Sequence, residues 1–134
     1  FNCPGQVVIS GEINAVKDIC EKFNSLGARR SLILPVGGAF HSSLMNDAKS
    51  ELKEAIDNTN FSEPSCPIYQ NFNSNKTVVI SEIKNNLINQ LTNPVLWTQT
   101  INNMINDGIN DFIEVGPGKV LHGLIRKINR GLLN

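Results

Sequence analysis

The chain has 134 residues, 40% of them apolar and 18% charged, and its 12 lysines and arginines balance its 12 aspartates and glutamates. This length suffices for a domain with a real core, no apolar run approaches the ~18 residues that a membrane span needs, and the balanced charge gives no overall attraction to nucleic acid. Three widely spaced cysteines, two histidines and the lack of a Cys-x-x-Cys pair argue against a disulfide framework and a structural zinc site.

The first predicted elements alternate between strand and helix. Residues 6–9 predict a strand that ends at a Ser-Gly turn. Apolar residues three and four apart then predict a helix, which Gly27 ends with a left-handed cap. Residues 31–34 predict a second strand, which Pro35 halts.

A glycine-containing loop at 37–41 opens the rest of the chain, and Ser42 or Ser43 is suited to cap the helix that follows it. Leu44 and Ile56 are expected on the core face of that helix. The remaining predicted elements are helix, strand, polar turn, helix, helix, strand and helix, over residues 42–58, 68–71, 73–77, 83–91, 95–106, 111–115 and 120–128. This alternation predicts an α/β fold with a mainly parallel sheet.

His41 is the main candidate for chemistry, because it stands between a Gly-Gly loop and a helix, where α/β folds place ligands. A neutral imidazole there can take a proton from a hydroxyl nucleophile and return it to a leaving group. The alternative is that His41 only caps or packs at the loop. His122, between apolar neighbours on the last predicted helix, is interpreted as structural or exposed.

No convincing nucleophile accompanies this base. The chain has no Gly-x-Ser-x-Gly elbow, and Ser42 and Ser43 are better suited to capping than to attack. A second glycine turn, Gly116-Pro117-Gly118, precedes the last helix but lacks the spacing of a phosphate loop, so a structural turn is favoured.

Five blocks of the sequence, in order and with suitable gaps, resemble the malonyl-CoA:acyl-carrier-protein transacylases. They are Asn2-Cys3-Pro4-Gly5-Gln6-Val7-Val8-Ile9-Ser10-Gly11, Gly27-Ala28-Arg29-Arg30 with Leu34-Pro35-Val36, Gly38-Ala39-Phe40-His41-Ser42-Ser43-Leu44-Met45, Gln90-Leu91-Thr92-Asn93-Pro94-Val95-Leu96-Trp97 and Glu114-Val115-Gly116-Pro117-Gly118-Lys119-Val120-Leu121. The resemblance runs over essentially the whole chain. It identifies the chain as the C-terminal half of such an enzyme, without the nucleophilic serine.

The resemblance implies a ping-pong transfer in type II fatty acid synthesis. A serine outside this chain takes malonyl from coenzyme A and passes it to the phosphopantetheine thiol of acyl carrier protein, and His41 acts as base and acid in both steps. The residue matching Gln90 orients the histidine through its backbone carbonyl. No cofactor is implied, since the coenzyme A thioester is a substrate.

Further roles follow from the same resemblance. Phe40 and Asn2 are expected to contact substrate, and a ring at Phe40 fills the space that a 2-methyl branch needs, although ordinary packing is the alternative. The expected contacts with acidic acyl carrier protein are basic, namely Arg29, Arg30, Lys119 and Arg126.

The implied architecture is the C-terminal part of an α/β-hydrolase-like acyltransferase core (residues 36–134) plus a partial ferredoxin-like small subdomain (residues 1–35). The missing N-terminal half is then an expected partner. The alternatives are an acyltransferase domain from a polyketide or multifunctional fatty acid synthase, and a non-catalytic α/β module that binds a carrier protein. The expected compartment is cytoplasm or plastid stroma, and the asparagine-rich composition, typical of an AT-rich genome, tips the preference to plastid.

Overall fold

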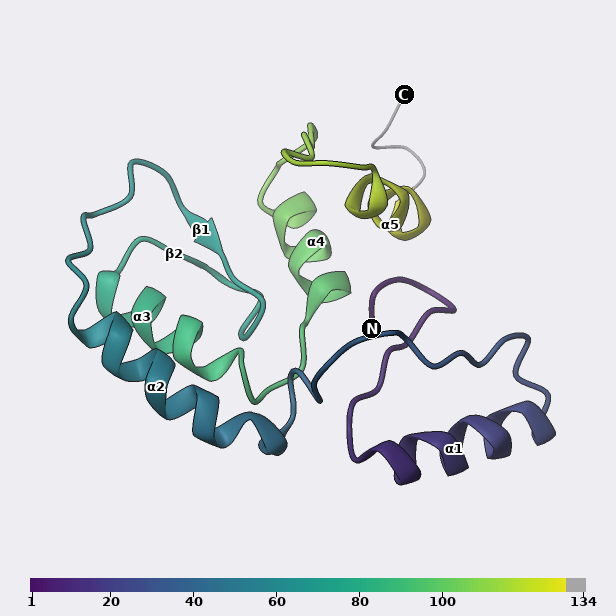
Figure 1. Ribbon diagram of the computed structural model, residues 1–134. Coiled ribbons are helices and arrows are strands. Elements are labelled where there is room, and N and C mark those ends of the chain that lie inside the picture. The colour runs from purple at the N-terminus through teal and green to yellow at the C-terminus, as the bar shows by residue number, and fades with distance from the viewer. Residues whose placement is uncertain (130–134) are drawn as a thin grey trace.

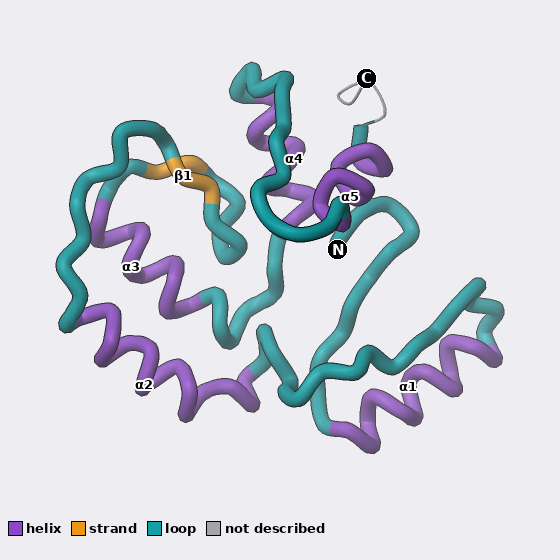
Figure 2. The backbone as a smooth tube through the Cα atoms, turned by 45° about the horizontal axis from the view of Figure 1, so that its top comes forward, coloured by secondary structure: helices purple, strands orange, loops and turns teal. Residues whose placement is uncertain are grey.

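The computed structural model describes residues 1–129, and its helices form a helical pair with a small hairpin, a second pair and a separate helix (Figure 1). Figure 2 shows the same grouping after rotation. The elements in chain order are α1 (Ile13–Ser25), the 3-10 helix η1 (Ser43–Met45), α2 (Asn46–Asp57), β1 (Ile68–Tyr69), β2 (Lys76–Thr77), α3 (Ile80–Asn89), α4 (Trp97–Asn106) and α5 (Val120–Ile128).

Helices α2 and α3 lie side by side, with the β1–β2 hairpin beside α3 (Figures 1 and 2). Each helix contributes a buried isoleucine, Ile56 from α2 and Ile83 from α3. The two strands are antiparallel, with Ile68 opposite Thr77 and Tyr69 opposite Lys76. The expected strand at 68–71 is therefore present in its first two residues, and the expected polar turn at 73–77 ends in the second strand.

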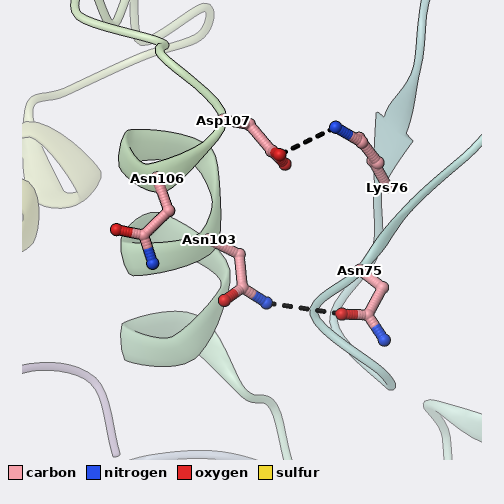
Figure 3. Close-up of a pocket in the computed structure, with 5 residues that line it drawn as sticks. All are labelled: Asn75, Lys76, Asn103, Asn106 and Asp107. Carbon is pink, nitrogen blue, oxygen red and sulfur yellow. Dashed lines mark hydrogen bonds and ion pairs between the residues drawn. The ribbon is translucent and has the colours of Figure 1, made fainter.

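Polar contacts attach helix α4 to the hairpin. Asn103 donates to the Ser74 carbonyl oxygen at 2.9 Å, and the Lys76 ammonium lies 2.7 Å from the Asp107 carboxylate. Figure 3 shows Asn103 and Asp107 directed across a pocket of about 270 Å³ toward the hairpin. The Tyr69 hydroxyl also donates to Asp107, which raises the pKa of Tyr69 to about 12.

Helix α5 packs against α4, and a carboxylate caps its start. Glu114 accepts hydrogen bonds from the backbone N–H groups of Leu121 (3.1 Å) and His122 (2.9 Å), and these bonds, the His122 bond first, lower the pKa of Glu114. Gly116 and Gly118 both have positive φ, of 137° and 93°, and turn the chain between the carboxylate and the helix. The structural interpretation of this turn is confirmed, because a side chain of the protein already occupies the N–H groups that a phosphate would need.

The prediction of strands at residues 6–9, 31–34 and 111–115 is wrong for this structure, which has no strand at these positions. The part of the chain that the structure describes contains one sheet, the two-stranded antiparallel hairpin, so the expected parallel sheet is not observed there. A strand exists only when a neighbour completes its hydrogen-bond ladder, and within residues 1–129 the only such pairing of these segments is an isolated bridge between Gln6 and Cys3. Their apolar side chains stay exposed, with Val7 at 55%, Ile33 at 58% and Val115 at 93%.

The start of the α2 region also differs from expectation. Ser42 does cap it, since its hydroxyl accepts from the Leu44 N–H at 3.3 Å, but the capped turn is the 3-10 helix η1. Leu44, expected in the core, is 54% exposed, whereas Ile56 is buried as expected. Within residues 1–129, no helix has the length and apolar character required to cross a membrane.

Candidate active site

His41 is held in a backbone conformation that residues with a side chain rarely adopt. Its φ is 62°, in the left-handed region, and its backbone N–H donates to the Leu91 carbonyl oxygen at 3.1 Å. For a residue other than glycine this conformation costs on the order of 1 kcal/mol, and such strain concentrates at functional sites. In this backbone conformation the imidazole reaches the turn that follows α3.

The imidazole itself is anchored to that turn. His41 Nδ1 lies 2.7 Å from the backbone carbonyl oxygen of Gln90, the C-cap residue directly after α3. A carbonyl oxygen can only accept, so Nδ1 carries the proton and donates it. In the neutral ring, Nε2 is then the nitrogen with the free lone pair, which is the form required of a general base.

The turn that carries the Gln90 carbonyl is held by side chains from three parts of the chain. Asn71, just after β1, donates its amide N–H to Gln90 Oε1 at 3.1 Å. Lys49 of α2 donates to Asn89 Oδ1 at 2.9 Å, and Asn93 donates to the Asn89 carbonyl oxygen at 2.8 Å. The bonds from Asn71 and Lys49 attach the segment around the Gln90 carbonyl to the end of β1 and to α2.

Ser42, directly after the histidine, uses its hydroxyl for local structure. Ser42 Oγ donates to the Ala39 carbonyl oxygen at 2.6 Å and accepts from the Leu44 N–H. Both directions of hydrogen bonding are therefore engaged within the loop, as the capping interpretation expects. Within residues 1–129 the arrangement supplies a candidate base, and no described hydrogen bond joins its ring to a serine or cysteine.

Phe40 precedes the histidine, and its ring lies over Gly38. A Cβ placed on Gly38 would meet the Phe40 ring at 3.4 Å, and the Phe40 side chain is 45% exposed. Almost half of the ring is therefore open to solvent.

The other predicted site residues are not brought together with His41 by any hydrogen bond or ion pair described within residues 1–129. The Asn2 backbone N–H donates to the Gln6 carbonyl oxygen at 3.1 Å, and the neighbouring Phe1 carbonyl accepts from Thr98 of α4. The four basic candidates, Arg29, Arg30, Lys119 and Arg126, are all exposed. Roles in binding for these residues stay predictions.

Within the same described residues, no group of three or more His, Cys, Asp and Glu side chains that could hold a metal ion occurs. Sequence reasoning missed Asn71 and Lys49, which it treated only as parts of a strand and a helix. The one available signal was a polar residue at the end of a predicted strand, which α/β folds often place near ligands.

Comparison with known proteins gives a consistent assignment, although no family model matches the chain. The malonyl CoA-acyl carrier protein transacylase of Bacillus subtilis is 43% identical over 132 residues, which are 98% of this chain and 42% of that protein. The solved malonyl-CoA:acyl carrier protein transacylase of Xanthomonas oryzae superposes with a TM-score of 0.94 at 36% identity, over 98% of this chain and 42% of that one.

A malonyl-transacylase solved in complex with its acyl-carrier protein from a type II polyketide synthase superposes with a TM-score of 0.93 at 36% identity, again over 98% of this chain and 42% of that one. The chain thus spans less than half of the length of the relatives it matches. Over nearly all of its own length, the chain is homologous to the malonyl CoA-acyl carrier protein transacylases.

Proposed function

We propose that this chain is the C-terminal part of an enzyme that moves malonyl from coenzyme A to the phosphopantetheine thiol of acyl carrier protein, in type II fatty acid synthesis. The observation that carries the proposal is the 2.7 Å contact between His41 Nδ1 and the Gln90 carbonyl oxygen. It gives the imidazole the tautomer of a general base, in a chain that is 43% identical to a known transacylase.

The chemistry assigned to His41 has two symmetrical halves. Nε2 takes the proton of a serine hydroxyl as that oxygen attacks the malonyl thioester carbon, and then gives the proton to the departing coenzyme A thiolate. The malonyl-serine ester is next attacked by the phosphopantetheine thiol, whose proton passes to Nε2 and then to the serine oxygen. The serine belongs to the part of the enzyme outside this chain.

Gln90 serves His41 through its backbone rather than its side chain. A carbonyl dipole fixes the tautomer and orientation of the imidazole without adding a full negative charge to the site. It thereby replaces the carboxylate that orients the histidine in many Ser-His-Asp enzymes.

The architecture proposed for the chain has residues 1–35 in a ferredoxin-like small subdomain and residues 36–134 in an α/β-hydrolase-like core. The support is the apolar side chains of segments 6–9, 31–34 and 111–115, which lack strand partners. Segments 6–9 and 31–34 line one groove of about 1060 Å³ together with α1. The N-terminal half of the same enzyme is the proposed partner that completes these sheets.

The proposed substrate contacts are Phe40 and Asn2, and the proposed contacts with carrier protein are the exposed basic residues Arg29, Arg30, Lys119 and Arg126. Their positive charge suits an acidic carrier protein, and one structural neighbour was solved as a malonyl-transacylase with its acyl-carrier protein. That neighbour also favours a second candidate, the same transfer to a carrier protein of a type II polyketide synthase. The proposed compartment is cytoplasm or plastid stroma, with the asparagine-rich composition favouring plastid.

Intact-mass spectrometry after incubation with malonyl-CoA tests the proposed reaction. The full-length enzyme is expected to gain one malonyl group, and His41→Ala is expected to gain it more slowly by several orders of magnitude, as loss of a catalytic base does. The chain of residues 1–134 alone is expected to gain none. Equal rates for the enzyme and for His41→Ala would contradict the role of His41, and an adduct on the chain alone would place the nucleophile within it.

A further inference from the structure

We propose that Asn71 is a positioning residue for His41, acting through the side chain of Gln90 and the turn that follows it. The inference rests on the proposed function, because it concerns how the base of that reaction is held. Asn71 does not contact the imidazole. Its effect is exerted through the Gln90 carbonyl, which does.

Asn71 holds the turn at both of its ends. Its side-chain N–H donates to Gln90 Oε1 at 3.1 Å, and its backbone carbonyl accepts from the Leu96 N–H at 2.9 Å. Between these two points lie both acceptors of His41, the carbonyl oxygens of Gln90 and Leu91. One residue therefore brackets the segment that fixes the histidine.

The link matters because the Gln90 carbonyl has no partner of its own within the helix. Gln90 is the C-cap residue of α3, with φ −58° and ψ −25°, and carbonyls at the C-terminal end of a helix lack helical N–H donors. Their direction follows from the backbone angles of residues that fray easily. The bond from Asn71 to the Gln90 side chain restrains those angles and so keeps the carbonyl aimed at Nδ1.

Asn71 is itself well placed to act as a fixed point. The preceding residue, Gln70, donates to the Ile83 carbonyl oxygen at 3.1 Å and accepts from the Asn86 amide at 2.9 Å, so the end of β1 is locked onto α3. The Asn86 side chain belongs to a residue that is only 3% exposed. Consecutive side chains thus attach the strand end to the middle and to the end of one helix.

The strain at His41 makes the site sensitive to this restraint. A φ of 62° persists only while the surrounding structure enforces it, and both hydrogen bonds that anchor His41 end on the turn that Asn71 brackets. If the turn relaxes, the backbone anchor and the ring anchor loosen together. Binding of malonyl-CoA is expected to stay unchanged, because the bonds of Asn71 end on Gln90 and Leu96 and not on the proposed substrate contacts.

The test is steady-state kinetics of the full-length enzyme with malonyl-CoA and acyl carrier protein. Asn71→Leu keeps the size of the side chain and removes the bond, and kcat is expected to fall about 10-fold to 100-fold with KM nearly unchanged, as misplacement of a catalytic group does. Gln90→Ala keeps the backbone carbonyl and removes the acceptor of Asn71, so it should lower kcat similarly. The double variant should be no worse than either single variant, because both act through one bond.

Asn103→Ala is the control, since it removes the amide that donates to the Ser74 carbonyl, the Ser74 hydroxyl and Asn75 Oδ1, all outside this turn. It is expected to lower stability and leave kcat unchanged. Losses that multiply in the double variant, an unchanged kcat in Asn71→Leu, or an equal loss in Asn103→Ala would each overturn the inference.

A second readout separates this inference from the proposed function. In enzyme labelled with ¹⁵N-histidine, the imidazole shifts of His41 report which nitrogen carries the proton. Asn71→Leu should reduce the share of the Nδ1–H form, and an unchanged share would count against Asn71. If the unaltered enzyme transfers no malonyl, the proposed function fails, while the ¹⁵N shifts still decide whether Asn71 holds the ring.

Discussion

The ring of Phe40 lies over Gly38 and leaves almost half of its surface open beside the histidine. If Phe40 contacts the acyl group as proposed, a flat ring in that place occupies volume that a branched acyl group would need, whereas an unbranched malonyl group avoids it. A Cβ on Gly38 would meet the ring only at ordinary van der Waals distance, 3.4 Å, so the ring itself is the feature that fills this space.

Phe40→Ser is expected to relax discrimination against methylmalonyl-CoA in the full-length enzyme. Accommodating one extra methyl group is worth about 1–3 kcal/mol, or roughly 10-fold to 200-fold in relative kcat/KM. Competition between malonyl-CoA and methylmalonyl-CoA measures the change, with Phe40→Tyr as the variant that keeps the ring. Unaltered selectivity in Phe40→Ser would return Phe40 to simple packing.

The contact between the hairpin and α4 depends on one carboxylate shared by two partners. Asp107 accepts from Lys76 and from the Tyr69 hydroxyl, and these bonds, the Lys76 bond first, lower the pKa of Asp107. Because this pKa is depressed in the folded state, the stabilisation is present above the unfolded pKa and is lost as pH falls through the folded pKa. Tyr69 is the opposite case, since its pKa is raised to about 12. Its contribution to the stability of the folded state is therefore present below the unfolded pKa and is lost as pH rises through about 12.

Asp107→Asn should therefore lower the melting temperature at neutral pH by an amount that shrinks on acidification. The difference from the unaltered protein is expected to be constant above about pH 5, where an ordinary carboxyl group is ionised, and to diminish below about pH 4. Thermal unfolding followed by circular dichroism from acid to neutral pH measures it. A difference that stays constant to the lowest pH would show that the charge of Asp107 contributes nothing.

The described part of the molecule buries few apolar side chains and exposes many. Only Cys3, Ile56, Ile83, Ile101 and Ile125 form the buried apolar core of the described residues, while valines, isoleucines and leucines of segments 6–9 and 31–34 remain exposed. Contiguous apolar surface of this kind is typical of an interface. We expect the N-terminal half of the proposed enzyme to pack against these exposed apolar side chains.

Backbone hydrogen exchange tests whether the N-terminal half pairs with segments 6–9 and 31–34. Amides of residues 6–9 and 31–34 should exchange rapidly in the chain of 134 residues and slowly in the full-length enzyme, because paired strands protect their N–H groups. Amides of α3 should differ much less between the two and serve as the internal reference. Equal, rapid exchange of both segments in both proteins would contradict the proposed architecture.

Helices and strands differed in how far the sequence could predict them. The five α-helices within residues 1–129 lie where apolar periodicity expected them, because a helix satisfies its own backbone and needs only one apolar face. The runs at 6–9, 31–34 and 111–115 have the composition of strands, but pairing depends on neighbours that composition does not specify. At the site, the resemblance pointed to His41 and Gln90, and the structure brings the two together, while their catalytic roles stay predictions. Asn71 was missed because its bond to Gln90 joins residues 19 positions apart.

The hydrogen bond between His41 and Gln90 closes a loop between residues 49 positions apart. Closing a loop of this length costs conformational entropy, so we expect this bond to form late in folding, after each helix has formed. The bond joins the loop before α2 to the turn after α3, so it depends on the docking of these two helices. If the proposed function holds, a fluctuation that separates the two helices, each still intact, releases the imidazole and abolishes activity before the protein unfolds.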